Sequence, residues 1–175
     1  MDDHSRIATL YQTVWSNRRM HAEHWPVPPP RDSVIFAISE LGEVADAIMR
    51  LKSGYVRNHE RNVDLGKELA QVVEMAMLCI EPDFDLSLFY EPHIYTGGQN
   101  PLVVVTLTLG RLAELLFDSQ SHRDTALFYA VSCVIHVYYY ADRLAREHEI
   151  DDLETKIVEV SLLCPVCAKW EAYHD

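Results

Sequence analysis

Apolar residues recur at intervals of three and four along most of the chain, which is the spacing that places them on one face of an α-helix. This pattern predicts six helices, over about residues 7–15, 33–53, 63–81, 101–119, 121–147 and 151–163. Asp32 or Ser33 is expected to cap the second helix, and Pro101 suits the first turn of the fourth. Residue propensity alone favours a strand for the run LVVVTLTL that follows Pro101, but its continuation GRLAELLF is helical, so we predict a helix throughout. The expected fold is an all-α bundle of about six helices in a single domain, residues 1–175.

Composition and charge narrow the class of protein. The chain has 175 residues, of which 49% are hydrophobic and 24% charged, as in an ordinary globular domain. Asp and Glu number 27 against 15 Lys and Arg, and the net charge of −12 argues against binding to a nucleic-acid polymer or an anionic membrane. The N-terminal segment lacks the basic and apolar regions of a signal peptide, and the run 126–141 is too short and polar to span a bilayer. We therefore expect a cytoplasmic protein whose four cysteines are reduced thiols.

The clearest chemical pattern is a set of polar residues three apart on consecutive predicted helices. Glu40 and Glu43 lie on the second helix, Glu68 and Gln71 repeat the spacing on the third, and Asp64 precedes Glu68 by one turn. Side chains three residues apart project from adjacent turns of a helix. Two antiparallel helices with such pairs could hold one or two Mg²⁺ ions, which prefer carboxylate oxygens. The alternative interpretation is a solvated acidic edge without a ligand.

These segments carry a resemblance to a known family. SELGEVADAI (39–48) followed by KELAQVVEMA (67–76) resembles the ExxE…ExxD signature of the MazG-like, all-α nucleoside triphosphate pyrophosphohydrolases. The preceding HWPVPPPRDSVIFAI is similar to the segment that leads into the acidic helix in the dimeric dUTPase and MazG-like branches. The resemblance covers about residues 15–80. It implies hydrolysis of a (deoxy)nucleoside triphosphate to the monophosphate and pyrophosphate, with Mg²⁺, or Mn²⁺ in its place, held by four acids.

Carried onto this sequence, the resemblance assigns roles and also shows one departure. Glu40 and Glu43 match ExxE, and Glu43 or Glu40 would orient the attacking water while the other acids bind the metal. Glu68 matches the first acid of ExxD, but Gln71 stands where the family has Asp. A shifted frame, DLGKELAQVV, makes Asp64 the acid instead, and either frame lacks one carboxylate. Two functions therefore stay open: a pyrophosphohydrolase, or a catalytically degenerate relative that binds a nucleotide or a partner protein.

Basic and aromatic residues near the acidic pairs are candidates for substrate binding. Guanidinium and ammonium groups bind phosphate oxygens, and four of them lie between the two acidic helices: Arg50, Lys52, Arg57 and Arg61. Trp25 is a candidate for contact with the nucleobase. Solubility and loop packing are the alternative roles of these side chains. The lone Cys164–Cys167 pair lacks the two further ligands that a zinc site needs.

An internal repeat is also predicted. ELGEVADAI (40–48) aligns without gaps with TLGRLAELL (108–116), so that Glu40 falls on Thr108 and Glu43 on Arg111. Residues 1–82 would then be the half with the motif, and 101–175 a degenerate repeat related to it by a pseudo-twofold rotation. Such a chain could be a pseudo-dimeric monomer. The run 138–140 of three tyrosines cannot share one helix face, which keeps a homodimer open.

Overall fold

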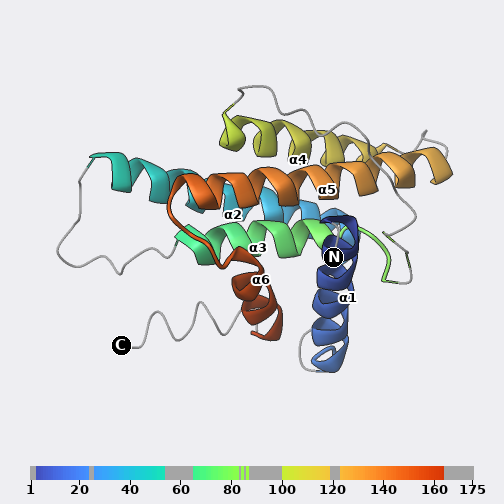
Figure 1. Ribbon diagram of the computed structural model, residues 1–175. Helices are drawn as coiled ribbons and strands as arrows, with labels where there is room; N and C mark the ends of the chain where they lie inside the picture. The colour runs from blue at the N-terminus through green and yellow to red at the C-terminus, as the bar shows by residue number, and fades with distance from the viewer. Residues whose placement is uncertain are drawn as a thin grey trace.

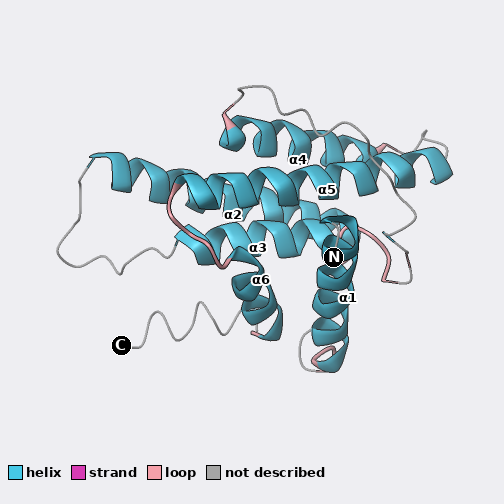
Figure 2. Ribbon diagram, viewed as in Figure 1, coloured by secondary structure: helices cyan, strands magenta, loops and turns pink. Residues whose placement is uncertain are grey.

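The computed structural model describes residues 3–23, 26–53, 65–82, 84, 86, 100–118 and 123–163. Apart from single residues, the regular secondary structure in these ranges is α-helical, and the ranges contain no strand (Figure 2). Along the chain the helices are α1 (Asp3–Met20), α2 (Pro30–Ser53), α3 (Leu65–Met77), α4 (Pro101–Phe117), α5 (Arg123–Glu147) and α6 (Leu153–Leu162), as labelled in Figure 1. The predicted all-α fold is confirmed, including the helix at LVVVTLTL. None of the described helices combines the length and the apolar character needed to cross a membrane.

Four of the helices form a bundle, and the other two cover part of it. Helix α2 packs against α3 and α4, and α5 packs against α4 and α3, which closes the ring. Helices α1 and α6 pack against each other, and α6 lies against α3. Figure 1 shows α1 and α6 running steeply across the direction of the bundle helices. The core is continuous through these layers, since fully buried side chains come from all six described helices: Val14, Val34, Leu69, Leu109, Val134 and Ile157.

The neighbours of the bundle helices correspond between the two halves of the chain. Helix α2 contacts α3 and α4, and α4 contacts α5 and α2, so exchanging the pair α2–α3 with the pair α4–α5 preserves the contacts. An internal repeat predicts this exchange. Helices α1 and α6 have no place in it, because α1 precedes α2 whereas α6 follows α5. The repeat stays a prediction, and it applies to these two helix pairs.

The ends of two helices show how proline sets a helix start. The expected cap of the second helix at Asp32 or Ser33 is wrong, because α2 already begins at Pro30 and both residues lie in its first turn. Their amides donate to the Pro29 carbonyl, each at 2.9 Å. A proline at the helix start lacks only an N–H that would have no helical acceptor. Helix α4 begins at Pro101 as predicted, with Asn100 as its N-cap.

The connection from α5 to α6 contains a residue in the left-handed region. Glu149 has a φ of 60°, which is the backbone conformation that favours glycine. The amide of Ile150 donates to the Ala145 carbonyl at 2.9 Å, so the chain closes the last turn of α5 through Glu149. Helices commonly end in this way with glycine at the left-handed position. Glu149 therefore has a strained backbone conformation at a position where glycine would be unstrained.

We expect Glu149→Gly to increase the free energy of unfolding by about 0.5–1 kcal/mol, because it relieves the left-handed strain. Urea unfolding followed by circular dichroism measures the change. Glu147→Gly, at the last residue of α5, is the matched control and should destabilise the protein. A Glu149→Gly variant that is no more stable than the parent would contradict this account of the turn.

Candidate functional site

Three of the predicted acidic residues meet at the packed boundary of α2 and α3. Glu40 and Glu43 come from α2, Glu68 comes from α3, and carboxylate oxygens of all three lie within 4.8 Å of one another. The three-residue spacing places Glu40 and Glu43 on one flank of α2, and the packing of α2 on α3 brings Glu68 opposite them. We call Glu40, Glu43 and Glu68 the carboxylate cluster.

The carboxylate cluster extends from the interior of the bundle to its surface. Glu40 is buried, with 7% of its surface exposed, whereas Glu68 is half-buried and Glu43 is exposed. Along α3, the residues that keep partial exposure are Lys67, Glu68 and Gln71. The side of α3 that reaches solvent is therefore the side that carries the motif positions.

Burial and like charge change the protonation of the cluster. Burial, followed by the negative charges of Glu43 and Glu40, raises the pKa of Glu68 to about 7, although Lys67 acts in the opposite direction. The Glu68 side chain also has a hydrogen bond with Glu40. A hydrogen bond between two carboxyl groups needs a proton on one of them. Without a cation, Glu68 thus keeps its proton up to about pH 7, whereas a carboxyl group in water loses it well below neutral pH.

The chemistry of the cluster fits a hard divalent cation. The Glu68 Oε2 atom is buried and has no hydrogen-bond partner among the described residues. A buried carboxylate oxygen without a partner is unfavourable, and three carboxylates this close repel one another unless a proton or a cation lies between them. Mg²⁺ and Mn²⁺ take carboxylate oxygens in this way and keep water ligands on an open side. Glu43 gives the cluster such a side, because it is exposed.

A buried ion pair lies behind the cluster. Glu74, further along α3, is 1% exposed and accepts a hydrogen bond from Arg18 Nε of α1 at 2.5 Å. Arg18 Nη1 also donates to the Leu163 carbonyl after α6 at 2.9 Å, so one guanidinium connects α1, α3 and the end of α6. Burial raises the pKa of Glu74 to about 7 against the opposing effect of Arg18, and the charge of Glu40 raises it further. The charge of Glu74 therefore acts on the cluster, and Arg18 balances it.

Arg18 is the residue that sequence reasoning missed. Glu74 appears in the sequence as one more acid in the row on the third helix, whereas the structure places it in the core with its own cation. The sequence of α1 contains a pattern that could have revealed Arg18 as a buried residue. Arg18 follows Val14 by four residues and Ile7 by eleven, so a charged residue continues the buried stripe of an amphipathic helix.

The other predicted site residues have different positions. Gln71 is half-buried one turn beyond Glu68. Arg50 is paired with Asp46 on the same helix, which leaves less of its charge for a ligand. Lys52 is exposed in the last turn of α2. Several predicted residues lie outside the described part of the chain: Trp25, Arg57, Arg61, Asp64, Cys164 and Cys167.

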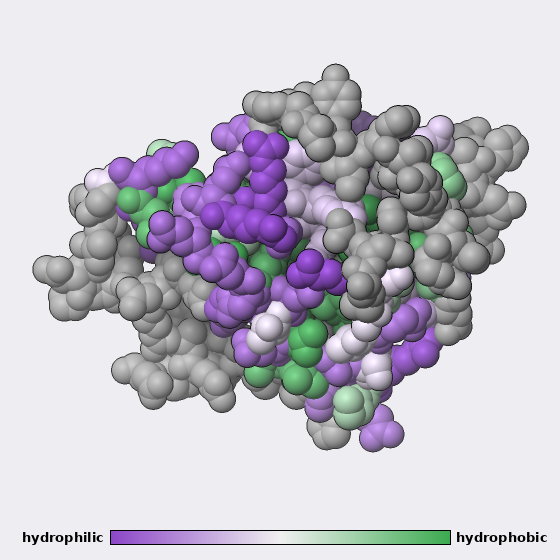
Figure 3. Space-filling model, in the orientation of Figure 1, coloured by the Kyte–Doolittle hydropathy of each residue, from purple (hydrophilic) through white to green (hydrophobic). Residues whose placement is uncertain are grey.

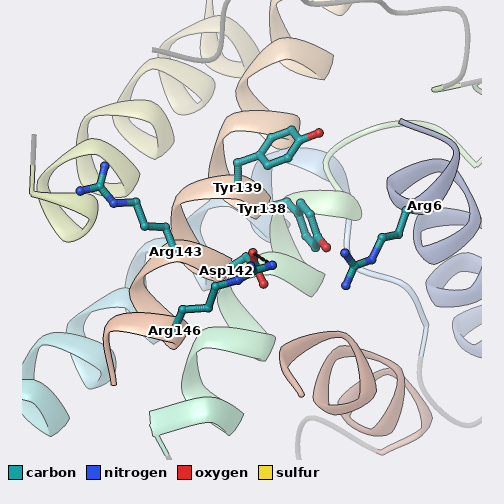
Figure 4. A pocket seen from close by; sticks show the side chains of 6 residues that line it. All are labelled: Arg6, Tyr138, Tyr139, Asp142, Arg143 and Arg146. Carbon is teal, nitrogen blue, oxygen red and sulfur yellow. Dashed lines mark ion pairs between the residues drawn. The ribbon is translucent and has the colours of Figure 1, made fainter. Parts of the chain in front are cut away.

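A groove of about 310 Å³ lies elsewhere, on α1 and α5. Figure 4 shows its lining residues, which are Arg6, Tyr138, Tyr139, Asp142, Arg143 and Arg146. The arginines here have acidic partners: Arg6 pairs with Glu154 at 2.5 Å, and Arg146 pairs with Asp142 at 2.8 Å. Figure 3 shows hydrophilic residues over this part of α5. Arg143 pairs with Glu147 at 3.2 Å, so each of the three arginines has an acidic partner and the groove offers an anion little unpaired positive charge.

Comparisons with protein families, with curated proteins and with solved structures give no significant match to this chain. The interpretation of the site therefore depends on the motif and on the geometry of the residues.

The raised pKa of Glu68 predicts a pH-dependent stability in the metal-free protein. Its pKa is about 4.5 when unfolded and about 7 when folded, so the folded state holds more protons between these values. The stabilising contribution is complete below about pH 4.5 and is lost as the pH rises through 7. The free energy of unfolding should therefore fall by on the order of 1–2 kcal/mol as the pH rises, a value reduced because Glu68 is partly exposed. We expect Glu68→Gln to remove this fall.

Urea unfolding in the presence of a chelator, between about pH 5 and pH 8, measures this effect. Glu159→Gln, at an exposed position of α6, is the control for removing one glutamate. Equal pH dependence in Glu68→Gln and in the parent would contradict the protonation of the cluster.

The Arg18–Glu74 pair predicts a strong asymmetry between single and double variants. Arg18→Met leaves Glu74 buried without its cation, and we expect a loss of about 3–5 kcal/mol of unfolding free energy. Arg18→Met/Glu74→Met removes both charges and should recover much of that loss. Thermal and urea unfolding of the three proteins test this expectation. If the double variant is as unstable as Arg18→Met, the loss comes from packing rather than from the unpaired acid.

Proposed function

We propose that this chain hydrolyses a (deoxy)nucleoside triphosphate to the monophosphate and pyrophosphate, with Mg²⁺ at the carboxylate cluster. The observation that carries the proposal is the convergence of Glu40, Glu43 and Glu68 from two helices at the spacing of the ExxE…ExxD motif. The buried Oε2 atom of Glu68 adds support, because a hard cation would satisfy it. A cytoplasmic location, where nucleoside triphosphates and Mg²⁺ meet, belongs to the same proposal.

The three acids have different tasks in this proposal because they differ in exposure. Glu40 and Glu68 lie deeper and are the residues that would hold the ion. Glu43 is exposed, so it is the acid that a water molecule can reach, and it orients that water and accepts its proton. The bound cation would supply charge neutralisation on the triphosphate and would make water more acidic. Attack at phosphorus also requires the water to lie in line with the leaving pyrophosphate.

Binding of a triphosphate to a chain with a net charge of −12 needs local cations. Lys52 is the described candidate, since it is exposed at the end of α2, six residues beyond Asp46 and nine beyond Glu43. Arg50 can contribute when a phosphate competes with Asp46 for it. Arg57, Arg61 and Trp25 remain part of the proposal from their places in the sequence.

A second candidate function has one observation in its favour. Gln71 stands at the position where the family pattern has Asp, and an amide oxygen can bind Mg²⁺ but adds no negative charge. The degenerate alternative is a protein that binds a nucleotide or a partner at this site without turnover.

The first test is release of pyrophosphate from a panel of nucleoside and deoxynucleoside triphosphates with Mg²⁺ or Mn²⁺. We expect Glu43→Gln to lower the rate by about 10²–10⁴-fold, because the amide cannot accept the proton of the attacking water. Glu159→Gln, an exposed glutamate on α6, should keep the parent rate. Nucleotide binding by calorimetry without any pyrophosphate release would favour the degenerate alternative.

A second test addresses the missing carboxylate. Gln71→Asp should tighten Mg²⁺ binding about fivefold or more, since a unit charge near a bound cation contributes on the order of 1–4 kcal/mol. Gln71→Asn shortens the side chain equally without adding charge, so it is the matched control, and titration calorimetry measures all three proteins. If neither Gln71→Asp nor Glu43→Gln changes Mg²⁺ binding, the acids are a solvated edge and the proposed function fails.

A further inference from the structure

The outer side of α2 and α4 carries large apolar side chains that are exposed to solvent. Those on one side of α2 are Ile35, Ile38 and Met49, and those on α4 are Val103, Leu107 and Phe117, with exposures from 43% to 68%. We call these six residues and the glycines between them the α2–α4 face. Within each helix these residues are separated by three or four positions, or by sums of such steps. This spacing places them on one side of the helix, as a single stripe. Phe36 and Leu51 are also exposed, but their positions place them on other sides of α2. The stripes do not point into the bundle, since the buried residues of α2 and α4 lie on the other side.

The two stripes lie side by side. Arg31, one turn before Ile35 on the same side of α2, donates from Nε to the Leu116 carbonyl of α4 at 2.8 Å. Its guanidinium also lies 5.3 Å from the centre of the Phe117 ring. The start of α2 is therefore beside the end of α4, and the two packed helices run antiparallel. Helices α1 and α6 contact α3 and each other, so they do not cover this face.

A glycine stands in the middle of each stripe. Gly42 and Gly110 are aligned by the internal repeat, are exposed, and have no atom within 4 Å of the place where a Cβ would be. Glycine destabilises the interior of a helix relative to alanine, so it is expected where another backbone comes close. No contact within the described chain requires either glycine. The open space at both positions leaves room for close approach by something outside this chain.

We propose that the α2–α4 face binds a second copy of this chain, face to face, in a twofold-symmetric dimer. Two antiparallel helices with matching stripes give the face an approximate twofold axis of its own. A twofold dimer brings the same patch of both subunits together, so two such apolar faces can cover each other. Each stripe also carries an acid at the same spacing, Asp46 on α2 and Glu114 on α4, and both acids are paired, Asp46 with Arg50 and Glu114 with Arg111, so two copies can approach without unbalanced like charges.

The size of the face fits this occupant. At roughly 100 Å² for each half-exposed large side chain, the six residues expose on the order of 600 Å². That area is at the upper end for the largest apolar patch of a monomer, ~300–600 Å². With a polar rim around it, the face approaches the ~800 Å² that each partner buries in a stable interface. The carboxylate cluster is on the opposite flank of α2, beside α3, so a dimer of this kind leaves it accessible.

Light scattering coupled to size-exclusion chromatography tests the proposal across protein concentrations. We expect the parent to have twice the chain mass of 20.1 kDa, and Leu107→Glu to have the mass of a single chain. Phe128→Glu is the matched control, because Phe128 is an equally exposed apolar residue on α5 outside the face, and it should stay dimeric.

Gly110→Leu is a second variant, which should leave the fold of the single chain intact. The position has room for a side chain within the monomer, so circular dichroism should stay unchanged while the dimer dissociates. A single-chain mass for the parent at every concentration would overturn the proposal, as would a dimer that survives both Leu107→Glu and Gly110→Leu. Flotation of the parent with neutral lipid vesicles, abolished by Leu107→Glu, would assign the face to a membrane instead. Mg²⁺ binding by these variants should equal that of the parent, so failure here is separate from failure of the proposed hydrolysis.

Discussion

Helix α3 has to bury almost its whole surface, and this constraint organises the rest of the structure. It contacts α2, α5 and α6, with a smaller contact to α1, so apolar residues are required around nearly all of its circumference. The side chains that escape full burial are Lys67, Glu68 and Gln71, on one narrow side. An acid elsewhere on α3 is buried and needs a cation from another helix, which is why Glu74 is paired with Arg18. The core and the candidate site are two sides of the same helix.

The electrostatics of the molecule follow from that arrangement. Arg18 balances Glu74 inside the core, and Asp46 and Arg50 balance each other on the surface of α2. Within the carboxylate cluster, burial and the charges of Glu43 and Glu40 raise the pKa of Glu68 to about 7, so protonation of Glu68 would relieve the repulsion. A proton and a divalent cation relieve the same repulsion, so they compete for these oxygens. If Mg²⁺ binds there as proposed, it should therefore displace a proton.

The two helix pairs of the bundle have similar packing but different chemistry. The pair α2–α3 carries the carboxylate cluster, whereas Thr108 and Arg111 stand on α4 at the positions that align with Glu40 and Glu43. The second pair therefore completes the core without adding acids. What α2 and α4 share is their outer stripe, with a glycine at the centre of each. One flank of α2 thus carries the carboxylate cluster, and its outer side carries an apolar stripe like that of α4.

Periodicity by itself determined the class of the fold, the order of the helices and the pairing of acids on α2, because helix geometry alone places residues three and four apart on one side. It also determined the helix at LVVVTLTL, since Pro101 and the continuing helical pattern outweigh the strand propensity of valine and threonine. The start of α2 was misplaced because aspartate and serine are good caps in general, while Pro30 begins the helix here. Only the tertiary structure decided that Glu68 faces Glu40 and Glu43, that Glu74 belongs to Arg18 and that the stripes of α2 and α4 lie together. These contacts join residues far apart in sequence, and their geometry depends on how whole helices pack, which no local pattern specifies.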